Sequence, residues 1–171
     1  MTVYYFAYGA NLSPKELDHC NFKYEWKKTC ILNNYELKLN HLSIPFLIPS
    51  YFNIQSNKGK KVHGILYKSD KKNLLRLEEK ELFYKLIEIN IKINDKNYKA
   101  ITFQSNITNN YHKKIDNHYK NLVIENLKII NAPKKYIKNI EKYELFEYKY
   151  LRILLVLITL YIIYKILSFR I

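Results

Sequence analysis

Hydrophobic and polar positions alternate along the first two-thirds of the chain, and such alternation is typical of half-buried β-strands. The expected strands lie within residues 3–8, 24–39, 62–67, 83–93 and 98–103. The last two flank the polar segment Asn94–Asn97, so they are expected to form a hairpin. The alternation therefore predicts a sheet that is mostly antiparallel.

Helix-start signals or helical spacing of Leu and Ile replace the alternation in three places. Ser13 and Pro14 are typical of a helix start, and Asp70 precedes a second short helix over Lys71–Glu81. The segment 115–147 has apolar residues three and four positions apart and is interrupted by Pro133, which predicts two helices. These patterns predict an α+β fold, with a small, mostly antiparallel β-barrel and flanking helices.

The composition changes after Tyr150. Ile153–Tyr164 is uncharged and largely aliphatic. One interpretation is a buried final helix, but a helix that is apolar on every face leaves a large exposed patch on a small domain. We therefore expect two parts, a folded domain over 1–148 and a hydrophobic, transmembrane helix over 149–171 that anchors the domain to a membrane from the cytoplasm.

Composition and charge add little about partners. The 171 residues carry a formal charge of +14, but the lysines are scattered among many Ile, Asn and Tyr residues. Coding bias with a solvated surface is the favoured interpretation, and a basic adaptor for nucleic acid or a membrane surface rests on charge alone. No specific nucleic-acid partner is expected. Cys20 and Cys30 lack the spacing of a zinc site or a disulfide framework.

The strongest chemical signal lies near the N-terminus, in the run Tyr5-Phe6-Ala7-Tyr8-Gly9-Ala10-Asn11-Leu12. A glycine after a strand permits a turn with positive φ that points successive amide N–H groups into one concavity, where an anion or a developing oxyanion can bind. The run resembles the Tyr-Gly-Ser-Asn-Leu signature of the gamma-glutamylcyclotransferase family. Val62–Tyr67 resembles that family's V-x-G-x-x-Y/W strand, and Leu74–Tyr84 resembles its L-x-x-L-D-x-x-E-G segment.

The resemblance continues with Tyr119, Pro133 and Tyr136, which are similar to the family's Y…P-x-x-Y helical region, and it covers about residues 3–146. It implies that Glu81 is the catalytic acid/base. Glu78 and Glu79, the neighbouring carboxylates, are expected on the surface. The residues implied in substrate binding are Tyr8, Gly9, Ala10, Asn11, Leu12, Tyr84 and Tyr119.

The activity implied is intramolecular cyclisation of a small gamma-glutamyl amino acid or amine to 5-oxoproline, with release of the amine. The resemblance implies neither a metal nor an organic cofactor. A rival hypothesis is a catalytically inactive module of the same fold, held at a membrane, that binds a small anion or a protein terminus. The oligomeric state stays open.

Overall fold

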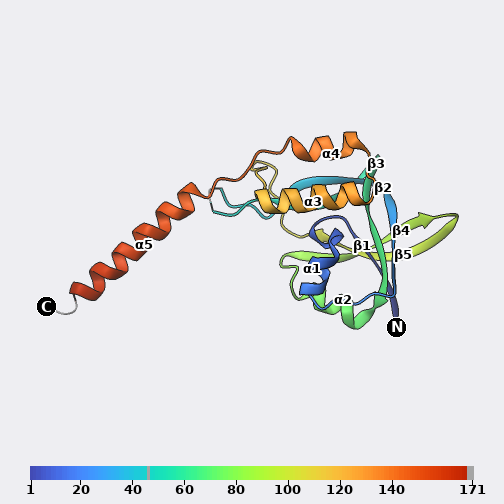
Figure 1. Ribbon diagram of the computed structural model, residues 1–171, viewed down its shortest axis with the longest axis horizontal. Helices are drawn as coiled ribbons and strands as arrows, with labels where there is room; N and C mark the ends of the chain where they lie inside the picture. Colours follow the sequence, from blue (N-terminus) through green and yellow to red (C-terminus); the bar gives the residue numbers. More distant parts are fainter. Residues whose placement is uncertain (46, 169–171) are drawn as a thin grey trace.

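The computed structural model describes residues 1–45 and 47–168 and contains one sheet with helices around it (Figure 1). The strands are β1 (Thr2–Ala7), β2 (Trp26–His41), β3 (Tyr51–Asp70), β4 (Tyr84–Ile93) and β5 (Lys96–Ser105). The helices are η1, a 3-10 turn (Ala10–Leu12), α1 (Pro14–His19), α2 (Lys71–Glu78), α3 (Asn117–Ile129), α4 (Lys134–Glu141) and α5 (Lys149–Ser168). The predicted α+β class, the hairpin and the pair of helices around Pro133 are confirmed.

The sheet is open and mixed, so the predicted barrel is wrong. The strand order is β2-β3-β1-β5-β4, and in the described part of the chain no ladder pairs the edge strands β2 and β4 with each other. β1 pairs antiparallel with β3 but parallel with β5, through Tyr5 and Ile101. Alternation along a strand predicts which face is buried, but strand tilt and stagger decide whether a sheet closes, and these leave no pattern in one sequence.

The turn between β4 and β5 shows why the hairpin could be predicted. Asn94 and Asp95 have φ of 45° and 60°. Two successive residues with positive φ make the tight turn that matches the twist of paired strands, and Asn and Asp tolerate this conformation well. The alternating residues on either side then pair from Tyr84 opposite Ser105 to Ile93 opposite Lys96.

Gly64 brings β3 close to β1. A Cβ atom at this position would lie 2.3 Å from the backbone oxygen of Ala7 and 2.5 Å from the ring of Phe6. Both distances are far below van der Waals contact, so only glycine fits here. The close approach fixes the end of β1, from which the chain turns into η1.

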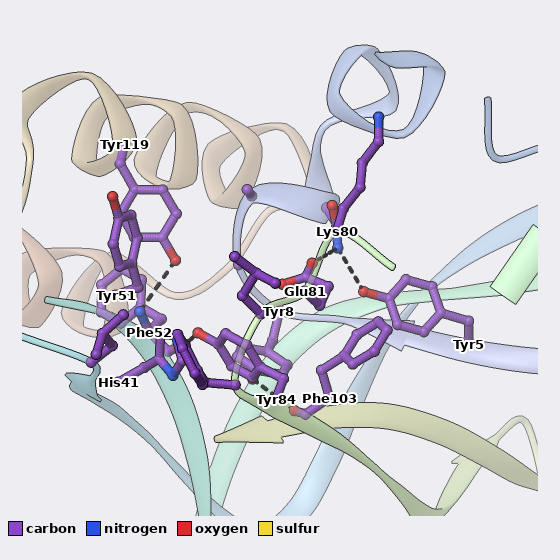
Figure 2. A pocket seen from close by; sticks show the side chains of 16 residues that line it. Tyr5, Tyr8, His41, Tyr51, Phe52, Lys80, Glu81, Tyr84, Phe103 and Tyr119 are labelled. Carbon is purple, nitrogen blue, oxygen red and sulfur yellow. Dashed lines mark hydrogen bonds between the residues drawn. The ribbon is translucent and has the colours of Figure 1, made fainter. Parts of the chain in front are cut away.

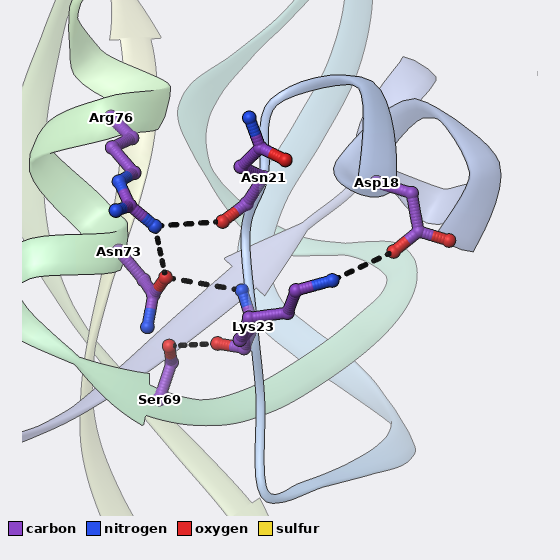
Figure 3. Close-up of polar contacts among 6 residues, drawn as sticks. All are labelled: Asp18, Asn21, Lys23, Ser69, Asn73 and Arg76. Carbon is purple, nitrogen blue, oxygen red and sulfur yellow. Dashed lines mark hydrogen bonds and ion pairs between the residues drawn. The ribbon is translucent and has the colours of Figure 1, made fainter.

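Polar contacts attach α2 to the segment that follows α1 (Figure 3). The side chain of Asp70 accepts a hydrogen bond from the amide of Asn73 at 2.8 Å and caps α2, as the sequence predicted. The side-chain oxygen of Asn73 accepts from the amide of Lys23 at 3.2 Å, and Arg76 donates to the backbone oxygen of Asn21 at 3.1 Å. These bonds hold α2 in place, and the chain leaving α2 carries Glu81.

The prediction of a membrane-spanning tail is wrong. Among the residues that the structure describes, no helix is long and apolar enough to cross a membrane. The physical reason is length, because the uncharged run 153–164 has twelve residues, whereas crossing a bilayer takes about 20. The prediction that this tail anchors the protein to a membrane is therefore wrong as well.

The predicted boundary between residues 148 and 149 stays a prediction. α5 begins at Lys149 and extends away from the sheet (Figure 1). Residues 169–171 of the predicted tail lie outside the described residues.

Candidate active site

A cavity of about 400 Å³ opens between η1, the chain after α2, and residues of the sheet and α3 (Figure 2). Its lining is mostly aromatic, with a few polar groups, as is common for small-molecule sites. The lining residues are Tyr5, Tyr8, Gly9, Ala10, Asn11, His41, Leu42, Tyr51, Phe52, Lys80, Glu81, Leu82, Phe83, Tyr84, Phe103 and Tyr119.

Glu81 reaches the cavity because the chain turns sharply after α2. Its amide donates to the backbone oxygen of Leu77 at 3.1 Å, which extends the last turn of the helix. Phe83 then adopts a positive φ of 63°, and β4 begins at Tyr84. The turn leaves the carboxyl of Glu81 inside the cavity, while Glu78 and Glu79 are exposed as expected.

Asn11 is hydrogen-bonded to Glu81, although the two residues are 70 positions apart in the sequence. The side-chain nitrogen of Asn11 donates to Oε1 of Glu81 at 2.7 Å and to the hydroxyl of Tyr5 at 2.9 Å. Figure 2 draws both bonds as dashed lines that end on the labelled Glu81 and Tyr5. Burial raises the pKa of Glu81 above its usual range, and the bond from Asn11 opposes part of that rise. The carboxyl therefore holds its proton more readily than an exposed glutamate, and it has a fixed donor when ionised.

Gly9 differs in conformation from what the sequence suggested, and it lies close to Tyr119. Its φ is −118°, so the prediction of a positive φ at this residue is wrong. A Cβ atom here would instead lie 3.1 Å from the hydroxyl of Tyr119, which is tighter than an ordinary contact. Gly9 precedes η1, and the amides of Ala10 and Asn11 open that turn, so neither has a partner within it.

Three tyrosines are fixed by hydrogen bonds to the backbone. The hydroxyl of Tyr8 donates to the oxygen of Phe103 and that of Tyr84 to the oxygen of Phe52, each at 2.7 Å. The hydroxyl of Tyr119 accepts from the amide of Phe52 at 3.2 Å. Since these bonds join the residue after β1 to β5, β4 to β3, and α3 to β3, the aromatic walls of the cavity are held from several elements at once.

The structure brings together all but one of the residues that the sequence proposed. Glu81 and six of the seven proposed binding residues line the cavity, whereas Leu12 is fully buried in the core and does not. Lys80 also lines it, but its amine donates to the backbone oxygen of His19 at 2.7 Å and points away from the aromatic side chains (Figure 2). Across the described residues, no group of His, Cys, Asp and Glu is arranged to hold a metal ion.

Sequence reasoning missed Tyr5 and His41 as lining residues. Tyr5 lies in the predicted N-terminal strand and begins the run that carries the family signature, but it stands before the Tyr-Gly-Ser-Asn-Leu signature itself. His41 ends β2 without any neighbouring motif, and a single histidine in a strand has no pattern that would separate a core role from a site role.

Comparison with known proteins identifies the family of the chain. A sequence profile of the family described as gamma-glutamyl cyclotransferase, AIG2-like, matches residues 5–121, so the chain belongs to this family. The matched range contains the N-terminal motif, Glu81 and Tyr119. A search of curated proteins found no match.

Solved structures share the fold. A protein named gamma-glutamyl cyclotransferase superimposes with a TM-score of 0.74 at 20% identity, covering 86% of this chain and 91% of its own. The human uncharacterized protein loc79017 gives 0.73 at 21% identity, covering 86% and 90%. A yeast gamma-glutamyl cyclotransferase specific to glutathione gives 0.53 at 11% identity, covering 84% and 97%. At such identities the likeness establishes the fold.

Proposed function

We propose that the protein is an active gamma-glutamylcyclotransferase that converts a gamma-glutamyl amino acid or amine to 5-oxoproline and the free amine. The observation that carries the proposal is the contact between Asn11 and Glu81 inside one cavity. The contact joins two motifs that are far apart in the sequence and gives a buried carboxyl a defined partner.

Glu81 is suited to both proton transfers of such a reaction. As a carboxylate it takes a proton from the α-ammonium group of the substrate. The freed amine attacks the δ-carbonyl carbon, the ring C–N bond forms, and the bond to the leaving nitrogen breaks as Glu81 returns the proton. Overall, two protons pass from the attacking nitrogen to the leaving amine, which departs as an ammonium ion, and no water is consumed.

The raised pKa of Glu81 supports this double role. A group that must both accept and donate a proton works best when its pKa lies near the working pH, and such help contributes about 10²- to 10⁴-fold. Burial moves Glu81 in that direction, whereas the bond from Asn11 keeps the ionised form accessible.

The remaining walls are suited to holding a curled substrate. Because the nucleophile and the carbonyl belong to one molecule, positioning alone can supply roughly 7–11 kcal/mol. The first amides of η1, at Ala10 and Asn11, are candidates to stabilise the oxyanion that develops on the δ-carbonyl. Tyr84 and Tyr119, held by the backbone of Phe52, restrict the space in which the substrate can extend.

The experiment incubates the full chain with gamma-glutamyl dipeptides and gamma-glutamyl amines and measures 5-oxoproline. Each substrate is matched by its N-acetyl form, which has no α-amine able to attack. We expect 5-oxoproline from at least one free substrate and none from any blocked one. Binding of the free substrates without product would contradict the proposal and favour a binding module of the same fold.

A further inference from the structure

His41 lies at the part of the cavity that the mechanism above does not use. It ends β2, and its ring stacks on that of Tyr84 with centroids 3.9 Å apart and an interplanar angle of 28°. In Figure 2, His41 lies beside Tyr84 and Phe52, away from the cluster of Glu81 and Tyr5. The side chain is 4% exposed, so any polar contact it makes is made in a nearly dry environment.

The hydrogen bonds of Ser105 determine which ring nitrogen of His41 carries the proton. Ser105 Oγ lies 2.5 Å from the backbone oxygen of Ile107, and a carbonyl has no proton, so the single hydroxyl proton must lie between them. His41 Nδ1 lies 2.8 Å from the same Oγ. Since the hydroxyl proton is already used, Nδ1 must donate to Oγ.

A neutral histidine that donates through Nδ1 has a bare lone pair on Nε2. Burial lowers the pKa of His41 to about 4, so the ring is neutral at pH 7. Within the described part of the chain Nε2 has no hydrogen-bond partner. The protein does not fully enclose this atom. Because His41 lines the cavity, Nε2 is an acceptor that is open to a ligand there.

A gamma-glutamyl substrate has few donors to offer this acceptor. Its α-ammonium group is assigned to Glu81, and the α-carboxylate and the δ-carbonyl only accept. The remaining donor near the reacting carbon is the N–H of the scissile amide. An acceptor in an apolar cavity costs free energy when unpaired, so a site of this kind selects ligands that supply the donor.

We propose that His41 Nε2 accepts a hydrogen bond from the N–H of the scissile amide and thereby selects secondary gamma-glutamyl amides as substrates. The proposal rests on the proposed function. As the tetrahedral intermediate forms, the leaving nitrogen becomes pyramidal and acquires a lone pair. With its N–H held by His41, that lone pair points away from the imidazole and is free to take the proton from Glu81. No proton is transferred to His41.

Two variants separate the two ring nitrogens. In His41→Asn, the side-chain amide lies where Nδ1 was, so it can still donate to Ser105 but leaves nothing at the position of Nε2. In His41→Gln, the longer side chain can present its carbonyl oxygen near the position of Nε2. Melting temperatures of both variants are compared with that of the unchanged protein, so that loss of folding is recognised.

Two substrates separate the role of the N–H from general damage. Gamma-glutamyl methylamide has the scissile N–H, and glutamate γ-methyl ester has an oxygen in its place. The readout is the ratio of kcat/KM for the amide to that for the ester, with uncatalysed ring closure of the ester subtracted. We expect His41→Asn to lower this ratio at least 10-fold and His41→Gln to restore part of it.

An unchanged ratio in a folded His41→Asn protein would overturn the role of His41, even if both rates fall together. Should His41→Asn not fold, His41→Gln decides the question. A ratio for His41→Gln that is lower than the unchanged protein's supports the proposal, and an unchanged ratio, including a loss of both rates by one common factor, overturns it. If the unchanged protein turns over neither these two compounds nor any of the gamma-glutamyl dipeptides and amines tested above, the proposed function is contradicted instead, so the two failures are distinguishable.

Discussion

Replacing Asn11 by leucine should shift the pH dependence of activity, because Asn11 is the donor that favours the ionised form of Glu81. The bond of 2.7 Å joins an amide to a carboxylate, and hydrogen bonds to charged groups contribute about 1.5–3 kcal/mol. Since about 1.4 kcal/mol corresponds to a factor of ten, the ionised form should become roughly 10- to 150-fold less favoured relative to the acid. Leucine has nearly the same size, so the packing against Tyr5 changes little.

The assay is kcat/KM for 5-oxoproline formation as a function of pH, which reports the free enzyme's essential base. Activity should rise with pH as Glu81 ionises, and in Asn11→Leu this rise should occur at higher pH. Asn57→Leu is the matched control, because Asn57 donates to Glu36 at 2.9 Å and neither residue lines the cavity. A rise at the same pH in all three proteins would refute the reasoning about Asn11.

Three further outcomes are expected. At neutral pH, Glu81→Gln should be more stable to heat than the unchanged protein, because the raised pKa of Glu81 means that folding disfavours the ionised carboxyl. This cost disappears as the pH falls below the pKa of the carboxyl in the unfolded chain, about 4.3. A difference in melting temperature that grows toward low pH would contradict this. Gly64→Ala should lower the free energy of unfolding by about 1–3 kcal/mol, because its Cβ would meet β1 at 2.3 and 2.5 Å. The melting temperature should then fall by roughly 2–12 °C. An unchanged melting temperature would show that β1 and β3 can separate freely. Gly9→Ala should weaken activity, and adding Tyr119→Phe should recover part of it, because the 3.1 Å contact of the added Cβ is with the Tyr119 hydroxyl. If the activity losses of the two substitutions simply add, the contact with Tyr119 is not the cause.

The elements could be predicted wherever local chemistry decided them. The cap at Asp70, the turn at Asn94 and Asp95 and the break at Pro133 each depend on neighbouring residues, and each is found as expected. Whether a sheet closes depends on how strands that are distant in the sequence align. One sequence therefore could not show whether the sheet is a barrel or open. The apolar composition of the tail favours a membrane span, but its uncharged run is too short for one.

The site could be predicted in part, because its two main motifs were recognisable separately. Glu81 and Asn11 were both named from sequence, but nothing local indicates that their side chains touch. Leu12 belongs to the same motif, and the 3-10 turn directs it into the core rather than toward the cavity. His41 was missed because its importance depends on Ser105 and Tyr84, which are 64 and 43 positions away.

The central claim is that the carboxyl of Glu81 moves the protons of the cyclisation. It is tested most directly by kcat for 5-oxoproline formation in Glu81→Gln, measured beside Glu79→Gln, whose exposed side chain lies two residues earlier. We predict that Glu81→Gln reduces kcat at least about 100-fold, since acid/base help contributes 10²- to 10⁴-fold, and that Glu79→Gln does not. Turnover by Glu81→Gln within a few-fold of the unchanged protein would contradict the claim.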